Sequence, residues 1–234
     1  MRRNAITLIL TQIAMLALVC QAEGQQTQTP YPQMAPFKQY LIADRNAEIA
    51  LARSAAPKSI SDHAEILVMG RQGYDTAVKG TNGFVCMVER SWTSPTDSPD
   101  FWNPKVRSPF CLNPAAVRSY LPITIMKTRL ALAGKSKEQM LAAIQAAFDQ
   151  KKLPPIERGA MCYMMSKQGY LNDQGRNWHP HVMIFSPLIK PDAWGANLDG
   201  SPVVAVDDTE DRFTVFMILV ARWSDGTTDS NPLD

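Results

Sequence analysis

Residues 64–91 read AEILVMGRQGYDTAVKGTNGFVCMVERS, and three apolar runs in them predict three consecutive β-strands. The runs cover 64–69, 74–79 and 84–91, and Asn82-Gly83 precedes the last of them. Asn-Gly between two apolar runs is a strong hairpin signal, because both residues tolerate the positive φ of a type I′ turn. We therefore expect the three strands to form an antiparallel meander.

Helical patterns flank this group of strands. The clearest begins at Ser136, which forms a capping-box pattern with Gln139 and is followed by apolar residues on one face. The other helices are expected at 37–54, from Pro114 after its cap Asn113, and at 123–133. The helical block after Asn113 separates the first group of strands from a second one.

The second group of strands is expected at 160–166, 179–185, 203–206 and 213–223. The last run is apolar on both faces, which is typical of a central strand covered on both sides. Strands followed by helices and again by strands predict an α+β fold. We expect a single domain over residues 37–224, with a largely antiparallel sheet, three to four helices packed on it, and a disordered polar tail at 225–234.

The N-terminus has the pattern of a secretion signal. Arg2 and Arg3 precede an apolar run that is shorter than a membrane-spanning helix, and the small residues Cys20 and Ala22 follow at the two positions needed for cleavage after Ala22. We expect a signal peptide at 1–22, a flexible linker at 23–36, and export to the periplasm or the extracellular space. Cys20 leaves a second possibility open, in which the chain is lipid-anchored through this cysteine.

The charge balance excludes one class of partner. The chain has 24 Lys plus Arg and 22 Asp plus Glu, so cleavage of the signal, which removes Arg2 and Arg3, leaves 22 of each. A neutral chain without a basic stripe is not expected to bind nucleic acid. No second long apolar run predicts a transmembrane segment after signal cleavage. The acidic run 207–211 is expected in a solvated turn, with a calcium ion as the alternative.

Three cysteines follow the signal, so an exported chain leaves one of them unpaired. Cys162 lies in an apolar run and is expected to be a small buried residue. Cys86 and Cys111 flank a segment with little else to hold it, since residues 92–113 contain four prolines and no helical or alternating pattern. A disulfide that closes this loop would stabilise the fold by about 3–4 kcal/mol on the chain-entropy model. We therefore expect Cys86 to pair with Cys111.

Four stretches are distinctive: KGTNGFVCM at 79–87, PFCL at 109–112, GAMCYMMS at 159–166 and WHPHVMI at 178–184. Together they resemble a group of uncharacterised exported bacterial proteins. The resemblance spans residues 50–187. It implies an exported bacterial domain with paired cysteines at 86 and 111, and it implies no activity.

His179-Pro180-His181 is the pattern that points most directly to chemistry. Two residues apart on a strand, both imidazoles project from one face and can reach one metal ion. His63, carboxylates or Met183 would have to complete the ligand set of such a site, with a divalent metal as the cofactor. The alternative is structural, with Trp178 and the two histidines forming the entrance to a strand and Pro180 at a position that needs no ladder donor.

Methionines near this pattern also suit copper. Met161, Met164, Met165 and Cys162 offer soft ligands, but alternation on a strand sends half of them into the core. We therefore expect these methionines to fill gaps between the sheet and the helices.

Three aromatic residues in the cysteine-bounded loop, Trp92, Phe101 and Trp102, form a second candidate site. Exposed aromatics on a long loop often bind ligands, whereas the alternative is that they fold back over the sheet edge. The sequence favours an exported, non-enzymatic domain that binds a small ligand or an envelope component. The alternative is a metal-dependent hydrolytic enzyme that uses His179 and His181, and the sequence does not decide between the two.

Overall fold

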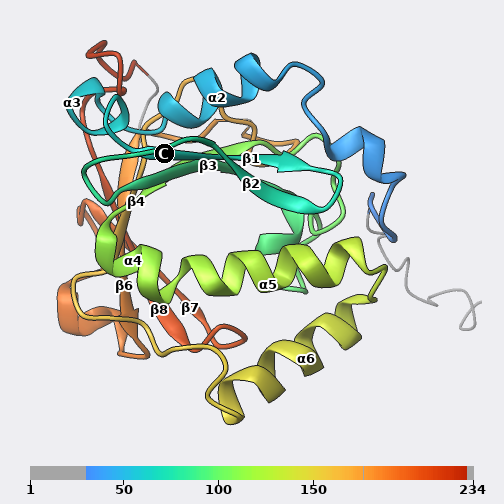
Figure 1. Cartoon of the computed structure of the whole chain (residues 1–234). Helices are drawn as coiled ribbons and strands as arrows, with labels where there is room; N and C mark the ends of the chain where they lie inside the picture. Colours follow the sequence, from blue (N-terminus) through green and yellow to red (C-terminus); the bar gives the residue numbers. More distant parts are fainter. Residues whose placement is uncertain (1–29, 176, 231–234) are drawn as a thin grey trace, which may run out of the picture.

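A computed structural model of the chain describes residues 30–175 and 177–230 (Figure 1). The predicted signal peptide at 1–22 lies outside the described residues, as do residues 23–29 of the predicted linker and 231–234 of the predicted tail. No helix in the described part of the chain is both long and apolar enough to cross a membrane.

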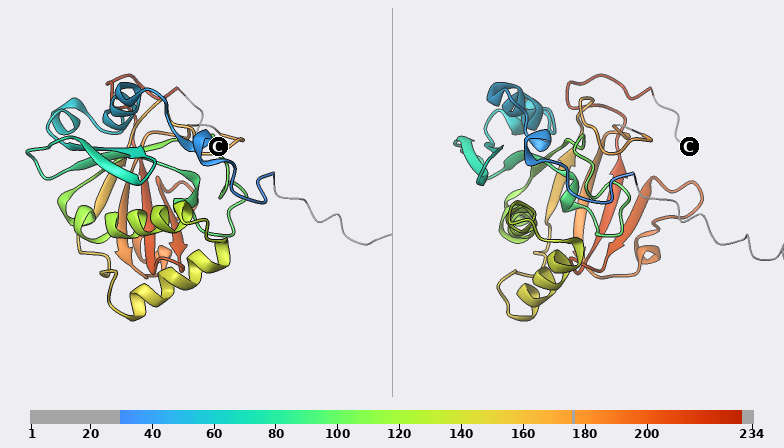
Figure 2. Two further views of the ribbon diagram at one scale, coloured as in Figure 1. Left: turned by 45° about the vertical axis from the view of Figure 1, so that its right-hand side comes forward. Right: turned by 90° about the vertical axis from the view of Figure 1, so that its right-hand side faces the viewer.

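One mixed sheet of eight strands organises the fold. The strands are β1 Glu65–Gly70, β2 Gly73–Val78, β3 Val85–Glu89, β4 Ser108–Leu112, β5 Met161–Met164, β6 His181–Pro187, β7 Val203–Asp208 and β8 Phe213–Leu219. Their order is β2-β1-β3-β4-β5-β6-β8-β7, and every neighbouring pair is antiparallel except β1 and β3. Figure 2 shows that β6, β7 and β8 cross the direction of β1 and β2, so the sheet is strongly twisted.

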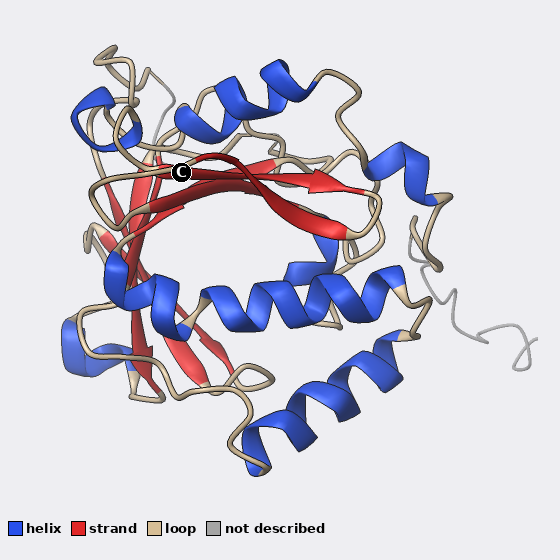
Figure 3. Ribbon diagram, viewed as in Figure 1, coloured by secondary structure: helices blue, strands red, loops and turns tan. Residues whose placement is uncertain are grey.

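Helices cover both faces of this sheet (Figure 3). The described residues form α2 Arg45–Arg53, α3 Lys58–Ser61, α4 Pro114–Ser119, α5 Leu121–Leu132 and α6 Lys137–Asp149, with short 3-10 helices η1 Phe37–Tyr40, η2 Ser91–Thr93 and η3 Pro191–Trp194. Helix α2 lies on one side of β1 and β3, whereas α5 and α6 lie on the other side. The α+β class and the largely antiparallel sheet are confirmed.

The predicted helix starts are confirmed where a side chain caps the helix locally. The Asn113 side chain accepts a hydrogen bond from Ala116 N, and Ser136 and Gln139 form both bonds of the capping box. The helix predicted at 37–54 is instead divided, because η1 ends before Asp44 caps the start of α2.

The predicted meander is wrong, because β3 pairs with β1 in parallel and makes no pair with β2. Residues 79–84 do turn, but they carry the chain across the end of β1. Thr81 N and Asn82 N both donate to the His63 carbonyl, at 2.8 and 3.3 Å. A Cβ at Gly80 would lie only 2.2 Å from Glu65 N, so only glycine allows this crossing.

Strand β4 lies within the segment that was expected to be a loop. It pairs antiparallel with β3 and places Cys111 directly opposite Cys86. These two cysteines form a disulfide, as predicted, and Cys162 is buried and free. The four prolines concealed β4, because Pro109 occupies its second position and opposes Val88.

The hydrophobic core has layers on both faces of the sheet. The larger layer lies under α4, α5 and α6 and includes Met87, Phe110 and Phe185. On the opposite face, α2 covers Ile66, Val88 and the disulfide. Both layers contain residues of β1, β3 and β4, so these three strands are packed on both of their faces.

Candidate functional site at the histidine pair

Strands β5 and β6 bring the histidine pair next to a methionine. His181 is the first residue of β6 and lies opposite Met164 of β5, whereas His179 and Pro180 precede the strand. Side chains of directly opposed residues lie on the same face of a sheet, with Cβ atoms about 4.5–5.5 Å apart. The register therefore places the side chains of Met164 and His181 next to each other on one face of the sheet.

Each histidine ring is fixed through its Nδ1 atom. His181 Nδ1 donates to the His179 carbonyl at 2.7 Å, and His179 Nδ1 lies 2.6 Å from Asp229 Oδ2. Burial lowers the pKa of His181 below its ordinary value, against the bond to the His179 carbonyl, which raises it. Both side chains are buried, with 8% exposure for His179 and 3% for His181. Each ring has its Nε2 atom left for a ligand.

A small cavity is bounded by both histidines. Its volume is about 10 Å³, close to the minimum that holds one water molecule. The indole of Trp178 packs edge-on against both imidazoles, with ring centroids 5.8 Å from His179 and 5.0 Å from His181. The lining residues are Pro109, Met164, Ser166, Gly169, Leu171, Asn177, Trp178, His179, His181 and Trp223. This space fits a single ion or water molecule rather than an organic substrate.

The chain after β8 forms one wall of the cavity. Trp223 lines it, and Asp229 contacts His179 from behind. Ser224 N donates to the Met165 carbonyl at 2.9 Å, and Ser224 Oγ donates to the Ser54 carbonyl at 2.6 Å. Residues 225–230 of the predicted disordered tail therefore follow an anchored segment and supply a carboxylate to the site.

His63 and Met183, which the sequence offered to complete a metal site, lie away from the cavity. His63 is exposed in the segment before β1, and Met183 packs into the core layer under the helices. Within residues 30–175 and 177–230, no three His, Cys, Asp or Glu side chains form a group that could hold a metal ion. The methionine that does line the cavity is Met164.

The three loop aromatics do not form a surface. Trp92 and Phe101 are fully buried and Trp102 is 4% exposed. Trp92 Nε1 donates to Thr128 Oγ1 at 3.1 Å, and its ring packs on Tyr40 with centroids 4.8 Å apart. The structure thus places these residues in the core, as the alternative interpretation of the loop described, and Phe101 lines a cavity of about 10 Å³ beside Lys127.

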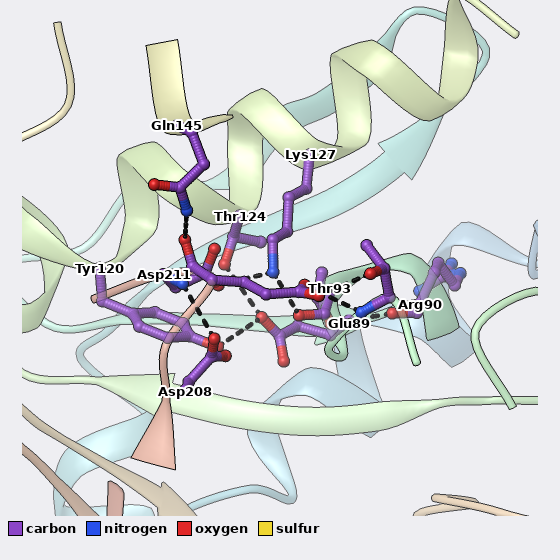
Figure 4. Close-up of polar contacts among 11 residues, drawn as sticks. Glu89, Arg90, Thr93, Tyr120, Thr124, Lys127, Gln145, Asp208 and Asp211 are labelled. Atoms are coloured by element: carbon purple, nitrogen blue, oxygen red, sulfur yellow. Dashed lines mark hydrogen bonds and ion pairs between the residues drawn. The ribbon is translucent and has the colours of Figure 1, made fainter. Parts of the chain in front are cut away.

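A buried polar cluster between α5 and the β7–β8 turn was not predicted from the sequence (Figure 4). Lys127 Nζ lies 2.5 Å from Asp211 Oδ2 and donates to the Thr93 carbonyl at 3.1 Å. Asp208 Oδ1 accepts from Asp211 N at 2.9 Å. The expectation of a solvated acidic turn is wrong for Asp208 and Asp211, because both are buried against Lys127 and its neighbours.

Glu89 belongs to the same cluster. It accepts hydrogen bonds from Thr124 Oγ1 at 3.0 Å and from the Tyr120 hydroxyl at 3.3 Å. Burial raises the pKa of Glu89 to about 7, which these hydrogen bonds and Lys127 oppose. Burial likewise raises the pKa of Asp211. The one signal for Glu89 in the sequence is its alternation with Val85 and Met87, which puts it on the core face.

Comparison with known proteins gives no relative for this chain: no family model matches it, and neither a curated protein nor a solved structure shows significant similarity. The candidate sites therefore have to be judged on their own geometry. Two oriented imidazoles line the histidine cavity, whereas a cavity of similar volume beside Lys127 is lined by a lysine and an aspartate that already pair with each other.

Proposed function

We propose that this protein is an exported binding domain without catalytic activity of its own, and that its ligand is a small ion held by His179 and His181. One observation carries the proposal. Both rings have Nδ1 bonded to an oxygen atom and both line the same cavity, so their Nε2 atoms are the donors left to bind a common ligand.

The size of the cavity favours binding over hydrolysis. A metal-dependent hydrolase needs three protein ligands as a rule, an open coordination position and a cleft for its substrate. The cavity of about 10 Å³ has room for one ion or one water molecule. The nearby carboxylate of Asp229 is hydrogen-bonded to His179. This arrangement suits an ion better than a substrate and an attacking water molecule.

Export is supported by the signal pattern at 1–22 and by the Cys86–Cys111 disulfide, since disulfides persist in oxidising compartments. Lipid anchoring through Cys20 remains the alternative to a freely exported chain. The mass of the mature N-terminus distinguishes the two, because cleavage after Ala22 leaves Glu23 first.

The test is a titration of the purified mature protein with small ions, in which tryptophan fluorescence reports binding. Trp178 and Trp223 border the cavity, so a bound ion should change their emission with a 1:1 endpoint. The panel contains Zn²⁺, Ni²⁺, Cu⁺, Ag⁺, chloride and phosphate. We expect at least one of these ions to give a saturable change in the unmodified protein.

Two variants make the titration specific. The double variant His179→Ala/His181→Ala should lose the response, whereas His63→Ala, which alters an exposed histidine, should keep it. Metal content measured by mass spectrometry provides a second readout. Equal ion content and equal fluorescence changes in the double variant and the unmodified protein would refute the proposal.

A further inference from the structure

We infer that the ion is monovalent and soft, with Cu⁺ as the natural ligand, and that the Met164 thioether joins the two imidazoles in binding it. This inference rests on the proposed function of the histidine cavity and identifies its ligand. The donor atoms assigned to the site are His179 Nε2, His181 Nε2 and Met164 Sδ.

The type and number of the donors are the first argument. The cavity walls offer two imidazoles and one thioether, and a group of three His, Cys, Asp or Glu side chains is absent from the described residues. Zinc sites usually combine three or four nitrogen, sulfur or carboxylate ligands from the protein. A thioether with two imidazoles instead suits Cu⁺, a soft ion that is stable with two or three ligands.

Charge is the second argument. The solvation free energy that an ion loses on burial grows with the square of its charge, so a divalent ion in a dry site needs charged ligands around it. The lining residues contain no Asp, Glu, Lys or Arg: apolar residues such as Trp178 and Trp223 alternate with the neutral polar residues Ser166 and Asn177. Asp229 places a single carboxylate against His179, and one carboxylate favours a monovalent ion over a divalent one.

The orientation of the imidazoles is the third argument. Metal-binding histidines usually donate their second ring N–H to a carboxylate or a backbone carbonyl, which fixes the ring and raises its basicity. His179 has the carboxylate of Asp229 in this role, and His181 has the His179 carbonyl. Both rings therefore have the support that metal-binding histidines require.

The register of β5 selects one methionine from its cluster. Met164 and Cys162 lie on the face of the sheet under the helices, whereas Met161 alternates to the other face and Met165 follows the end of the strand. Cys162 packs in the core layer opposite Met183 and does not line the cavity. Met164 alone among these four borders the cavity.

The experiment measures Cu⁺ affinity under anaerobic conditions by competition with the chromogenic chelator bicinchoninate. Ag⁺ serves as a redox-inert probe of the same charge and softness. We expect the mature protein to remove one equivalent of Cu⁺ from the chelator. Met164→Leu keeps the volume of the side chain and removes the sulfur, and we expect it to weaken Cu⁺ and Ag⁺ binding by about 10-fold or more.

Two further variants serve as controls. Met126→Leu changes a half-buried methionine of α5 that does not border the cavity, so its Cu⁺ affinity should equal that of the unmodified protein. Asp229→Asn removes the charge behind His179 and should weaken binding by roughly 10-fold or more. Thermal unfolding of each apo variant confirms that the fold is retained.

The outcomes separate this inference from the proposed function. Tight binding of Zn²⁺ with no Cu⁺ or Ag⁺ binding would overturn the inference and leave ion binding by the histidines intact. Equal Cu⁺ affinity of Met164→Leu and Met126→Leu would overturn the role of the thioether. Failure of every ion to bind, or binding that survives the loss of both histidines, would refute the proposed function itself.

Discussion

Glu89 carries a carboxyl group inside the core, where water cannot stabilise its charge. Burial raises its pKa to about 7 in the folded chain, whereas an unfolded chain has the ordinary value of about 4.3. The folded state therefore holds this proton more tightly. Its contribution to stability is fully present below pH 4, and it is lost as the pH rises through 7.

We expect Glu89→Gln to remove the loss of stability that the ionisation of Glu89 causes at high pH. The amide is neutral at every pH and keeps an oxygen that can accept from Thr124 and Tyr120. Between pH 5 and pH 8, the free energy of unfolding should fall by roughly 3 kcal/mol more in the unmodified protein than in the variant. Urea unfolding at the two pH values measures this difference.

Glu138→Gln is the matched control for this experiment. The Ser136 hydroxyl donates to the exposed Glu138 carboxylate and lowers its pKa, so this group stays ionised at both pH values. Its replacement should change stability equally at pH 5 and pH 8. An identical pH dependence for Glu89→Gln and the unmodified protein would show that Glu89 is ionised in the fold at pH 5.

Single residues were predictable where their partners are close in the sequence. Asn113 and Ser136 cap helices through bonds to residues three positions away, and both were identified from local spacing. Lys127 and Asp211 are 84 positions apart, and Glu89 and Thr124 are 35 apart. Periodicity does not encode which distant polar residues meet, so this cluster could not be predicted.

The crossing between β2 and β3 depends on the absence of a side chain at Gly80. A Cβ there would lie 2.2 Å from Glu65 N and 2.6 Å from the Ala64 carbonyl carbon, and both are backbone atoms that cannot move aside easily. We expect Gly80→Ala to destabilise the protein by roughly 3–5 kcal/mol, as severe overpacking does. Chemical denaturation measures this change.

Gly134→Ala distinguishes crowding from backbone strain. Gly134 follows α5 with a φ of 67°, and a Cβ added there would meet no heavy atom of the described residues within 4 Å. Alanine at this position therefore incurs only the cost of the left-handed conformation, about 1–2 kcal/mol. If Gly80→Ala cost no more than Gly134→Ala, the close approach to β1 would not govern this connection.

The disulfide between β3 and β4 closes a separation of 25 residues. On the chain-entropy model, its removal in Cys86→Ala/Cys111→Ala should lower the free energy of unfolding by about 3 kcal/mol. Cys162→Ala is the control, because Cys162 is buried and unpaired. A reducing agent should lower the urea midpoint of the unmodified protein and of Cys162→Ala, and it should leave the double variant unchanged.

The positions of strands were predictable where the apolar pattern is continuous. The pairing between strands was not predictable from the sequence. Strands β1, β2 and β3 were located from their runs, but the Asn82-Gly83 turn was assigned to a hairpin that does not form. Turn chemistry specifies that the chain reverses, whereas tertiary contacts decide beside which strand it returns. Strand β4 was missed because Pro109 interrupts its pattern.

The fold class followed from the order of the elements along the chain, because strands on both sides of a helical block limit the possible architectures. The strand order in the sheet did not follow, since β4 and β5 are joined across the whole helical block between them. For the candidate site, the sequence identified both histidines but missed Met164 as their neighbour and Asp229 as the support of His179. Both contacts depend on register and on the path of the last residues.

The sheet consists of a first half, β1 to β4, and a second half, β5 to β8. A short strand pairing and polar contacts between distant segments hold the two halves together. Strands β4 and β5 pair through only two residue pairs. Across the core, Lys127 of α5 binds Asp211 near β8, and Thr96 N donates to the Glu210 carboxylate at 2.9 Å. We therefore expect the two halves to unfold as one cooperative unit.

Hydrogen exchange tests this expectation, because it reports the opening free energy of each strand separately. Amides of β3 and β8 should exchange with the same free energy and the same denaturant dependence. Lys127→Met leaves Asp211 buried without its counter-charge. The variant should lower the opening free energies of β3 and of β8 together, by roughly 3–5 kcal/mol. Lys105→Met, which breaks an exposed ion pair with Asp173, should leave both unchanged. A drop confined to β8 would show instead that the C-terminal strands open independently of the first half of the sheet.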